Sequence, residues 1–481
     1  MASRLGAALG APGRELRRLG FGAGFRGQSF CYRRLSVWVF AGEPSGDAIG
    51  ARALRALRIE AEARNDPVTS VEGVGGPAML AAGLRASLFP MEDVSVMGVA
   101  EVAASLPSLR RRLSQAAAAV NAAQPDVLLT IDAKGFSFRL AKAVTNEGTT
   151  KVHVVSPSWW AWRGGERNLR ALRVAGIDAV ACLLPFEPEG VRRAGPRAAF
   201  VGHPVVEDVR EGAGAFREAR EARRAAEARA GTETTVLGAL PGSRDQELDR
   251  HLPLFREACA ALSKRWRSLE PNLEEKNGRG RGSRKKTRTL RVEFLVLPRH
   301  RRRVRRELET WPVPATVTVA DAGDCQTRAS FFGATDAALV AAGTATAQAF
   351  AHGVPQVVAY RAHFATEWIA RALAKTPHAS LPNVALPALA PVPELLGASR
   401  ATPAALADAA ARVLRDERAR RAQTEARDAF LDALTPRDAS GAEVAPSLAV
   451  ARVALDAVEA KREKNARADE KKRRERAGAR T

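Results

Sequence analysis

The segment LSVWVFAGEPSGDAIGARALRALRIEAEAR (35–64) joins an apolar strand to a helix through a short turn. The first seven residues include one polar side chain, which is typical of a strand buried on both faces. Gly42 and Gly46 allow close approach of the backbone, and the helix that follows begins with free N–H groups. Glu43 and Asp47 are interpreted either as acceptors for sugar hydroxyls or as helix caps, and their spacing leaves both open.

The same succession of short apolar runs and helical stretches continues along the chain. It predicts strands at 35–42, 125–132, 150–157, 176–185 and 198–204, and in a second set at 235–244, 290–298, 315–320, 335–343 and 354–361. Buried strands separated by helices indicate parallel sheets with both faces covered. We therefore predict an α/β protein with two Rossmann-like domains, which bind ligands at the carboxyl ends of their strands.

The length of 481 residues exceeds one ordinary core and favours two domains. The charged stretch 205–234 is short of large apolar residues and marks their boundary. The predicted organisation is a leader (1–34), a first domain (35–205), a second domain (206–400) with a basic surface insertion (272–290), C-terminal helices (401–460) and a basic disordered tail (461–481).

The net charge of +22 first suggests a nucleic-acid partner. It is concentrated in three low-complexity segments, 1–34 with +6, 272–290 with +5 and 461–481 with +6, which leaves about +5 for the rest. Such segments are typically solvated and disordered. The sequence therefore predicts no specific nucleic-acid partner, and a basic surface-binding protein is the last of the function classes considered.

The first 34 residues contain seven arginines and one acidic residue. This composition is typical of an organellar transit peptide, and the alternative is an ordinary disordered N-terminus. The four cysteines are far apart and have no metal-site spacing, so we expect buried thiols and no metal. We also expect no cofactor. The longest uncharged run, 337–360, contains glycine, proline and polar residues and favours strand–helix–strand over a membrane span.

Two turns in the second half have the composition of phosphate sites. In PGSRDQE (241–247), Gly242 and Ser243 offer N–H donors and Arg244 adds a positive charge beside a helix start, although a capped turn is the alternative. The turn in AAGTATAQAFAHGVP (341–355) could contact phosphate or ribose, or could pack a helix through small residues. Its candidates are Gly343, Thr344, Ala345, Thr346 and Gln348.

A carboxylate also ends the strand in PDVLLTIDAKGFSFRLAK (125–142). Asp132 lies where the predicted strand leaves the sheet, and a carboxylate there is a candidate general base. An aspartate at the start of a helix is equally often an N-cap. The spacing alone leaves both interpretations open.

Together, these motifs resemble one family. In chain order they are AGEPSGD, GVGGPAM, VSVMGVAEV, PDVLLTIDAKGFSFRLAK, VSPSWWAWR, LLPFEPE, FVGHP, LGALPGSR, DAALVAAGTAT, VVAYR and SLPN. The set is similar to lipid-A-disaccharide synthase over about residues 36 to 400. The resemblance implies a GT-B glycosyltransferase, inverting and independent of metal, that works at a membrane surface.

The implied reaction transfers 2,3-diacylglucosamine from UDP-2,3-diacylglucosamine to 2,3-diacylglucosamine 1-phosphate (lipid X). Its products are a β-1,6-linked disaccharide 1-phosphate and UDP, in lipid A biosynthesis. Asp132 matches the family's essential aspartate and is the first candidate for the base, with Glu43 as the second. The alternative is another UDP-GlcNAc-dependent GT-B enzyme, a MurG-like transferase or an epimerase.

The resemblance also suggests substrate-binding residues, namely Ser45, Gly46, Ser156, Trp162, Arg163 and Asn383, the last facing the cleft. The segment from Ser156 to Arg163 matches a Ser-Pro-x-x-Trp-Ala-Trp-Arg block of the family. Its tryptophan cluster, Trp159, Trp160 and Trp162, either lines the acyl or sugar path or packs the loop. The sequence departs from the family pattern at two places. Lys134–Gly135–Phe136 replaces a Pro-Asp-Phe segment, as in plant-type members, and Gln348 replaces a glutamate.

Residues 106–113 bear on membrane contact. Leu106, Leu109 and Leu113 recur at helical spacing beside Arg110–Arg112, which fits either docking on an anionic membrane or a core-facing stripe. We expect peripheral association with an anionic membrane surface. The expected location is an organelle, the mitochondrion in preference to the chloroplast, and the sequence leaves a homodimer open.

Overall fold

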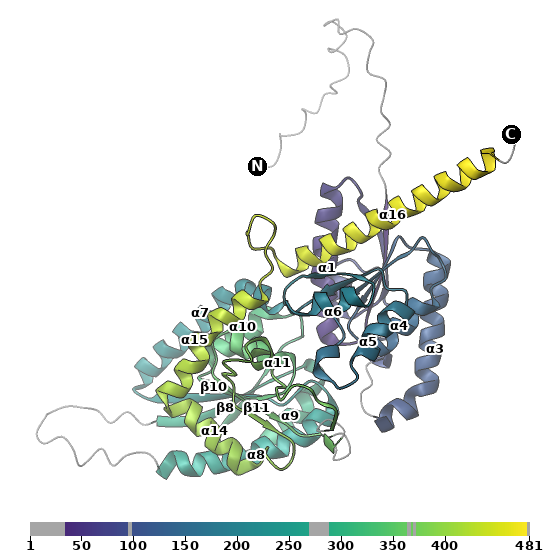
Figure 1. The fold of residues 1–481 in the computed structure, drawn as a ribbon. Coiled ribbons are helices and arrows are strands. Elements are labelled where there is room, and N and C mark those ends of the chain that lie inside the picture. The colour runs from purple at the N-terminus through teal and green to yellow at the C-terminus, as the bar shows by residue number, and fades with distance from the viewer. Residues whose placement is uncertain (1–33, 95–98, 269–287, 363–366, 369–371, 479–481) are drawn as a thin grey trace, which may run out of the picture.

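The computed structural model describes residues 34–94, 99–268, 288–362, 367–368 and 372–478. These residues form two domains, each built on a six-stranded sheet covered by helices (Figure 1). The first domain contains β1 (Leu35–Ala41), α1 (Pro44–Ala63), β2 (Val68–Val74), α2 (Pro77–Ala81), η1 (Met91–Val94), α3 (Val99–Ala123), β3 (Val127–Ile131), α4 (Lys134–Ala143), β4 (Thr150–Val154), η2 (Trp159–Ala161), α5 (Glu166–Val174), β5 (Ala179–Cys182), α6 (Glu187–Arg193) and β6 (Arg197–Phe200).

The second domain follows α7 (Val205–Ala230), which begins at the predicted boundary. It contains β7 (Glu233–Leu240), α8 (Asp245–Ser268), β8 (Arg288–Val296), η3 (Pro298–His300), α9 (Arg301–Leu308), β9 (Ala315–Val319), α10 (Cys325–Ala334), β10 (Ala337–Ala341), α11 (Thr344–Ala351), β11 (Gln356–Tyr360), α13 (Leu381–Ala385) and β12 (Glu394–Leu396). The chain ends with α14 (Pro403–Arg415), α15 (Glu417–Leu434) and α16 (Pro446–Gly478).

The strand order of each sheet locates its ligand-binding edge. The first sheet runs β2-β1-β3-β4-β5-β6 and the second β12-β11-β10-β7-β8-β9, and the strands of both are parallel. Counted from β7, the second order is that of the Rossmann fold. The order reverses between β1 and β3 in one sheet and between β7 and β10 in the other. Ligands of open α/β sheets bind outside the carboxyl ends of the strands at such points.

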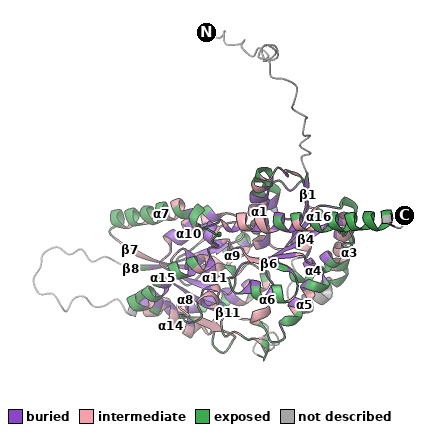
Figure 2. Ribbon diagram, turned by 45° about the horizontal axis from the view of Figure 1, so that its top comes forward, coloured by how far each residue is buried: buried purple, intermediate pink, exposed green. Residues whose placement is uncertain are grey.

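The cores confirm the prediction of strands buried on both faces. All five residues of β3 and all five of β10 are buried, and Figure 2 shows buried strands enclosed by helices with exposed outer faces. The ten predicted strands are all present. The sequence prediction missed β2 and β12, which lie at the edges of the two sheets.

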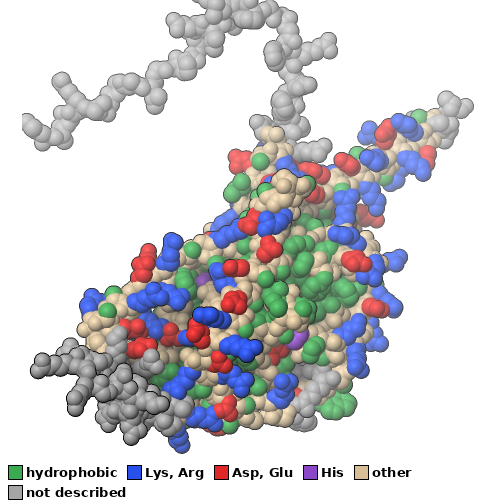
Figure 3. Space-filling model, turned by 60° about the vertical axis from the view of Figure 1, so that its left-hand side comes forward, with side chains coloured by type: hydrophobic (Ala, Val, Ile, Leu, Met, Phe, Trp, Pro, Cys, Tyr) green, Lys and Arg blue, Asp and Glu red, His purple; other side chains and the backbone are tan. Residues whose placement is uncertain are grey.

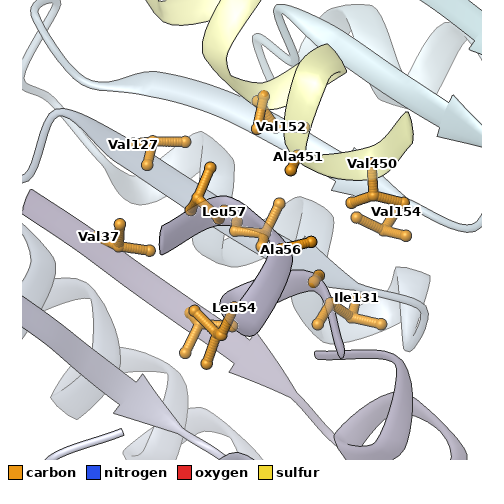
Figure 4. Close-up of a cluster of buried hydrophobic side chains, with 14 of the residues drawn as sticks. Val37, Leu54, Ala56, Leu57, Val127, Ile131, Val152, Val154, Val450 and Ala451 are labelled. Atoms are coloured by element: carbon orange, nitrogen blue, oxygen red, sulfur yellow. The ribbon is translucent and has the colours of Figure 1, made fainter. Parts of the chain in front are cut away.

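The helices predicted at 401–460 are present as α14, α15 and the first part of α16. The last of them, α16, returns to the first domain and buries Val450, Ala451 and Leu455 in its core (Figure 4). The tail at 461–481 was expected to be disordered, yet α16 continues to Gly478. Alternating charges at i,i+4, such as Arg474 and Glu470, favour this helix.

The insertion predicted at 272–290 lies outside the described residues up to 287, and residues 288–290 already belong to β8. Residues 1–33 of the predicted leader also lie outside the described part. Within that part, Figure 3 shows basic and acidic side chains interspersed over one face of the molecule.

An ionic clamp fastens α16 to the amino edge of the first sheet. Arg462 contacts Asp66 and lies 2.9 Å from Asp126, and Lys461 lies 2.9 Å from Asp178. Asp126 in turn accepts hydrogen bonds from the Ser36 N–H and hydroxyl at the start of β1. The clamp therefore links the end of the chain to the beginning of the first strand.

We expect Arg462→Ala to lower the free energy of unfolding by about 1–3 kcal/mol, between the values for exposed and buried ion pairs. The side chain is one-quarter exposed and its partners Asp66 and Asp126 are mostly buried, so its loss leaves two carboxylates without this cation. Denaturant unfolding followed by tryptophan fluorescence measures the change. Arg467→Ala, which removes an exposed pair with Glu463 on the same helix, is the control and should leave stability unchanged. Equal stabilities for the two variants would contradict the clamp.

Candidate functional site

The two ligand-binding edges meet at an ion pair. Glu43 follows β1 and Arg244 follows β7, and Arg244 Nη2 lies 2.7 Å from Glu43 Oε2. Both side chains are about one-quarter exposed. Because the pair joins residues 201 positions apart on different domains, it brings the loop after β1 into direct contact with the loop after β7.

Asp132 occupies a strained turn on the adjacent strand exit. Its φ is +49° and that of Ala133 is +44°, a region that non-glycine residues rarely adopt and that costs about 1–3 kcal/mol each. The turn is held from both sides, because the Asp132 N–H donates to the Val154 carbonyl and the Asp132 carbonyl accepts from the Ser137 hydroxyl at 2.7 Å. Gly42 leaves room for it, since a Cβ there would lie 3.2 Å from that of Ala133. Such strain is common at functional sites.

The two carboxylates have altered proton affinities. Asp132 is an exposed residue, yet the surrounding protein limits the hydration of its carboxylate, and this desolvation raises its pKa against the opposing effects of the Ala133 N–H, Arg244 and Lys134. Burial also raises the pKa of Glu43, Arg244 lowers it and the negative charge of Asp132 raises it again. A carboxylate with a raised pKa is a better proton acceptor when it is ionised.

The turn after β7 presents the predicted donors, but a carboxylate occupies them. Glu247 Oε2 accepts the N–H groups of Ser243 at 2.7 Å and Arg244 at 3.2 Å, and Glu247 Oε1 lies 2.8 Å from Arg244 Nη1. Gly242 has a φ of +119°, and a Cβ there would lie 2.4 Å from Glu247 Oε2. Sequence reasoning missed Glu247, although Arg244-x-x-Glu247 has the spacing at which a glutamate reaches back to an N-cap N–H.

The turn after β10 lies beside this loop, because β7 and β10 are neighbours. Gly343 has a φ of +147° with open space around it, and Thr344 is exposed at the start of α11, next to the half-buried Ala345. Thr346 is fully buried, and its hydroxyl donates to the Gly343 carbonyl. Thr344 and Ala345 are therefore open to a ligand, whereas Thr346 stabilises the turn.

Gln348 points into a buried network between the domains. Its Nε2 lies 3.5 Å from Asp208, which also pairs with Arg52 of α1 at 2.7 Å and Arg328 of α10 at 3.4 Å. A glutamate at 348 would set a second negative charge against Asp208. Glutamine can donate a hydrogen bond instead, which gives a physical reason for this departure from the family pattern.

The first turn of α1 settles the role of Asp47. Its carboxylate is buried and accepts the N–H groups of Gly76, Ala78 and Met79 at 2.8–3.0 Å. Asp47 is therefore a cap for α2, not a sugar ligand. Gly46 is buried beneath it and Ser45 is half-buried beside Glu43.

The three tryptophans of the 154–172 region have different surroundings. Trp159 packs into the first-domain core and Trp160 against an apolar cluster that both domains share. Trp162 is 39% exposed and pairs with Ala374 of the second domain in an isolated antiparallel bridge. Two of the three therefore pack the loop, and only Trp162 remains available to a ligand.

Trp160 also donates a hydrogen bond from Nε1 to Glu187, at 3.0 Å. Glu187 is only 3% exposed and its second oxygen accepts the Leu184 N–H. Burial raises the pKa of Glu187 to about 7, against these hydrogen bonds, which lower it. The carboxyl therefore changes protonation near neutral pH.

We expect Glu187→Gln to alter the pH dependence of stability. From the ordinary value of 4.5 up to about 7, the unfolded chain releases this proton and the folded protein keeps it. The wild type therefore loses up to about 1.4 kcal/mol per pH unit as pH rises through this window, and the variant does not. Denaturant unfolding at pH 5, 6 and 7 should show the variant gaining relative stability with pH. Parallel pH curves would contradict the shift.

Three further predicted contacts have other surroundings. Asn383 was expected to face the cleft, but it is 2% exposed and its amide bonds Val392 and Glu394 at 2.8–2.9 Å, so it fastens the chain before β12. Ser156 is also buried, two residues after the end of β4. The Arg163 side chain is exposed, and its N–H donates to the Leu373 carbonyl across the domains. Of these three, only Arg163 is open to a ligand.

The leucine stripe of α3 divides between the two interpretations. Leu109 and Leu113 pack against the first-domain core, and Leu106 is 41% exposed. Arg112 pairs with Asp93, whereas Arg110 and Arg111 are exposed.

The described part of the chain contains no helix that meets the length and hydropathy of a membrane span. No cluster of side chains in that part has the composition of a metal site.

A hollow of about 360 Å³ opens at the opposite, amino edge of the second sheet. Arginines of α7 and α15 line it, and Arg223 is bound there by Asp336 and Glu227. None of the predicted site residues lines this hollow. The candidate site therefore lies at the carboxyl ends of β1, β3, β7 and β10, and not in this hollow.

Comparisons with known proteins show the family to which the chain belongs. A family model described as Lipid-A-disaccharide synthetase matches residues 37–309 and 285–448. A "Lipid-A-disaccharide synthase" of Gluconobacter oxydans is 35% identical over 416 residues, covering 85% of this chain and 89% of the relative. An Arabidopsis thaliana protein named "Probable lipid-A-disaccharide synthase, mitochondrial" is 34% identical over 422 residues, covering 84% of each.

Solved structures share the two-domain GT-B fold. A UDP complex of Staphylococcus aureus MnaA has a TM-score of 0.50 and 11% identity, covering 83% of this chain and 92% of the other. A Neisseria meningitidis UDP-GlcNAc 2-epimerase bound to UDP-GlcNAc has a TM-score of 0.50 and 9% identity, covering 84% and 99%. At such identities the likeness concerns the fold alone. The family match over most of the length, with relatives about 35% identical, shows that this chain belongs to the lipid-A-disaccharide synthase family.

Proposed function

We propose that the chain transfers 2,3-diacylglucosamine from UDP-2,3-diacylglucosamine to lipid X, giving a β-1,6-linked disaccharide 1-phosphate and UDP. Membership of the family supports this reaction. The structural observation that carries the proposal is the 2.7 Å contact between Arg244 and Glu43, because it joins the phosphate-type turn of the second domain to the loop after β1. Asp132 lies close enough to Glu43 for its charge to raise the pKa of that carboxyl. The first domain then binds the acceptor and the second binds the UDP-sugar.

Asp132 is the proposed base. The acceptor 6-hydroxyl gives its proton to Asp132 while its oxygen attacks the anomeric carbon, and the bond from that carbon to the β-phosphate oxygen breaks. Direct displacement inverts the anomeric centre. Asp132 suits this role better than Glu43, because Arg244 holds Glu43 at 2.7 Å, whereas Asp132 is exposed at its strained turn.

The departing diphosphate requires positive partners. Arg244, the N–H groups of the 242–244 turn and the open N-terminus of α11 at Gly343 and Thr344 form one concentrated set of donors beside β7 and β10. Donors fixed in advance stabilise charge as it develops in the transition state. The proposed roles of Ser45, Trp162 and Arg163 are contacts with the two sugars.

The test is an assay of the purified chain with UDP-2,3-diacylglucosamine and lipid X. We expect UDP release in step with a product that has the mass of the disaccharide 1-phosphate. Non-acylated UDP-GlcNAc is the comparison substrate, and activity on it alone would favour another UDP-GlcNAc-dependent GT-B enzyme. Absence of UDP release from the acylated pair would reject the proposal.

We also propose peripheral association with an anionic membrane, because both substrates carry acyl chains. Exposed Leu106 lies near exposed Arg110 and Arg111 on α3. Co-sedimentation with vesicles containing anionic lipid should exceed that with zwitterionic vesicles. The double variant Arg110→Gln/Arg111→Gln should abolish the difference, and unchanged binding would reject this surface.

The proposed location is the mitochondrion, with residues 1–34 as the import signal. The arginine-rich composition of this segment supports the proposal, and so does the mitochondrial name of the Arabidopsis relative. A fusion of residues 1–34 to a fluorescent protein should enter mitochondria. Plastid or cytosolic fluorescence would contradict it.

A further inference from the structure

Glu247 lies at the third position of α8 and turns back toward the loop that precedes this helix. One carboxylate oxygen accepts two successive main-chain N–H groups, of Ser243 and Arg244, and the other contacts the Arg244 guanidinium. The side chain is 12% exposed, so the arrangement is well packed. A single carboxylate therefore fills a donor set of two amides and one guanidinium.

This donor set is the kind that binds phosphate. Successive N–H groups at a helix start, together with an arginine, are the usual partners of phosphate oxygens. Gly242 brings the loop so close to Glu247 that a Cβ at 242 would lie 2.4 Å from Oε2. A phosphate and the Glu247 carboxylate would therefore compete for the same donors.

We call the N–H groups of Ser243 and Arg244 and the Arg244 guanidinium the diphosphate cradle. We propose that the Glu247 carboxylate occupies this cradle when no ligand is bound, and that a nucleoside diphosphate binds by displacing it. The inference rests on the proposed function, which makes this loop the cradle. It adds a residue that sets the affinity for UDP and the rate at which UDP leaves.

The charges explain why displacement is required. The diphosphate is negatively charged, so a carboxylate left between it and the loop would repel it at short range. Arg244 now divides its guanidinium between Glu247 at 2.8 Å and Glu43 at 2.7 Å. When a phosphate takes these contacts, Arg244 loosens its hold on Glu43. Binding of the UDP-sugar therefore also changes the surroundings of Glu43 in the first domain. Return of the carboxylate then assists release of UDP.

A purely structural role for Glu247 is the alternative. Its contact with the Arg244 N–H is half of a capping box, which stabilises the start of α8. Glutamine serves the same position in capping boxes. Glu247→Gln therefore retains the cap while it removes the charge, and the two roles predict different UDP affinities.

The experiment measures the dissociation constants of UDP and of uridine by calorimetry in the full chain. We expect Glu247→Gln to tighten UDP about tenfold, as loss of a nearby like charge should, and to leave uridine unchanged because it has no phosphate. Glu247→Ala should also tighten UDP and provides a second route if the glutamine variant folds poorly. Glu257→Gln removes an exposed carboxylate from the same helix and should change nothing.

The outcomes separate this inference from the function on which it rests. UDP affinity that is equal or weaker in the Glu247 variants than in the wild type overturns the displacement. Equal tightening of UDP and uridine also overturns it, because the effect would not involve the diphosphate. A wild type that does not bind UDP overturns the proposed function itself. UDP release measured by stopped flow should be slower from Glu247→Gln than from the wild type. Faster release from the variant would contradict the proposal that the returning Glu247 carboxylate assists the release of UDP.

Discussion

Replacing Asp132 by asparagine should lower turnover at least about 100-fold, the scale of general base catalysis. Asparagine keeps the shape of the side chain and tolerates the left-handed backbone that Asp132 adopts at a φ of +49°. The strained turn should therefore survive while the proton acceptor is lost. Because the cradle is untouched, we expect the dissociation constant of UDP to stay unchanged.

Two measurements make this prediction specific. In the wild type, activity should fall with decreasing pH as Asp132 takes up a proton, with a midpoint above the ordinary pKa of 3.8, because desolvation raises the pKa of this carboxyl. The residual activity of Asp132→Asn should not show this decrease at low pH. Glu43→Gln is the matched carboxylate variant. If it abolishes turnover while Asp132→Asn remains nearly normal, Glu43 is the base.

Replacing Arg244 by alanine should reduce kcat/KM about 10²–10³-fold, the scale of losing one fixed donor to developing charge. Arg244 contacts carboxylates from both domains, so its loss removes a partner for the diphosphate and leaves Glu43 and Glu247 without their shared cation. UDP affinity should fall as well. Since Arg244 lowers the pKa of Glu43, the variant should also bind a proton at Glu43 at higher pH.

Calorimetry with UDP and steady-state assays on purified Arg244→Ala test this result. Arg244→Lys should recover only part of the loss, because an ammonium cannot make two directed contacts as a guanidinium does. Arg303→Ala, which removes an arginine of α9 that pairs with Asp249 of α8, serves as the control. Unchanged UDP affinity in Arg244→Ala would place the diphosphate elsewhere.

The central parts of both sheets could be read from the sequence because strands buried on both faces are continuously apolar. β3 and β10 meet that condition at every residue. The missed strands are edges, where one side lacks a neighbour. β2 reads VTSVEGV with exposed positions, and β12 has three residues. Such segments lack a distinctive pattern, and only pairing with β1 and β11 defines them as strands.

Part of the candidate site could be predicted from topology. Glu43 and Asp132 follow the neighbouring strands β1 and β3, and parallel strands end at one edge of their sheet. Arg244 follows β7 of the other sheet, so its contact with Glu43 depends on how the two domains pack. Asp47 and Asn383 belong to equally distinctive motifs, but their partners Met79 and Val392 are defined only by tertiary packing. Motif membership therefore identified an important position without distinguishing a cap from a ligand.

The return of α16 to the first domain has a consequence for biosynthesis. Val450, Ala451 and Leu455 fill a core whose first strand, β1, leaves the ribosome more than 400 residues earlier. During translation the nascent first domain must wait, with part of its apolar surface uncovered, for the last helix to emerge. A nascent chain of this kind is a natural client for chaperones, and the second domain can complete its fold while the first is still open.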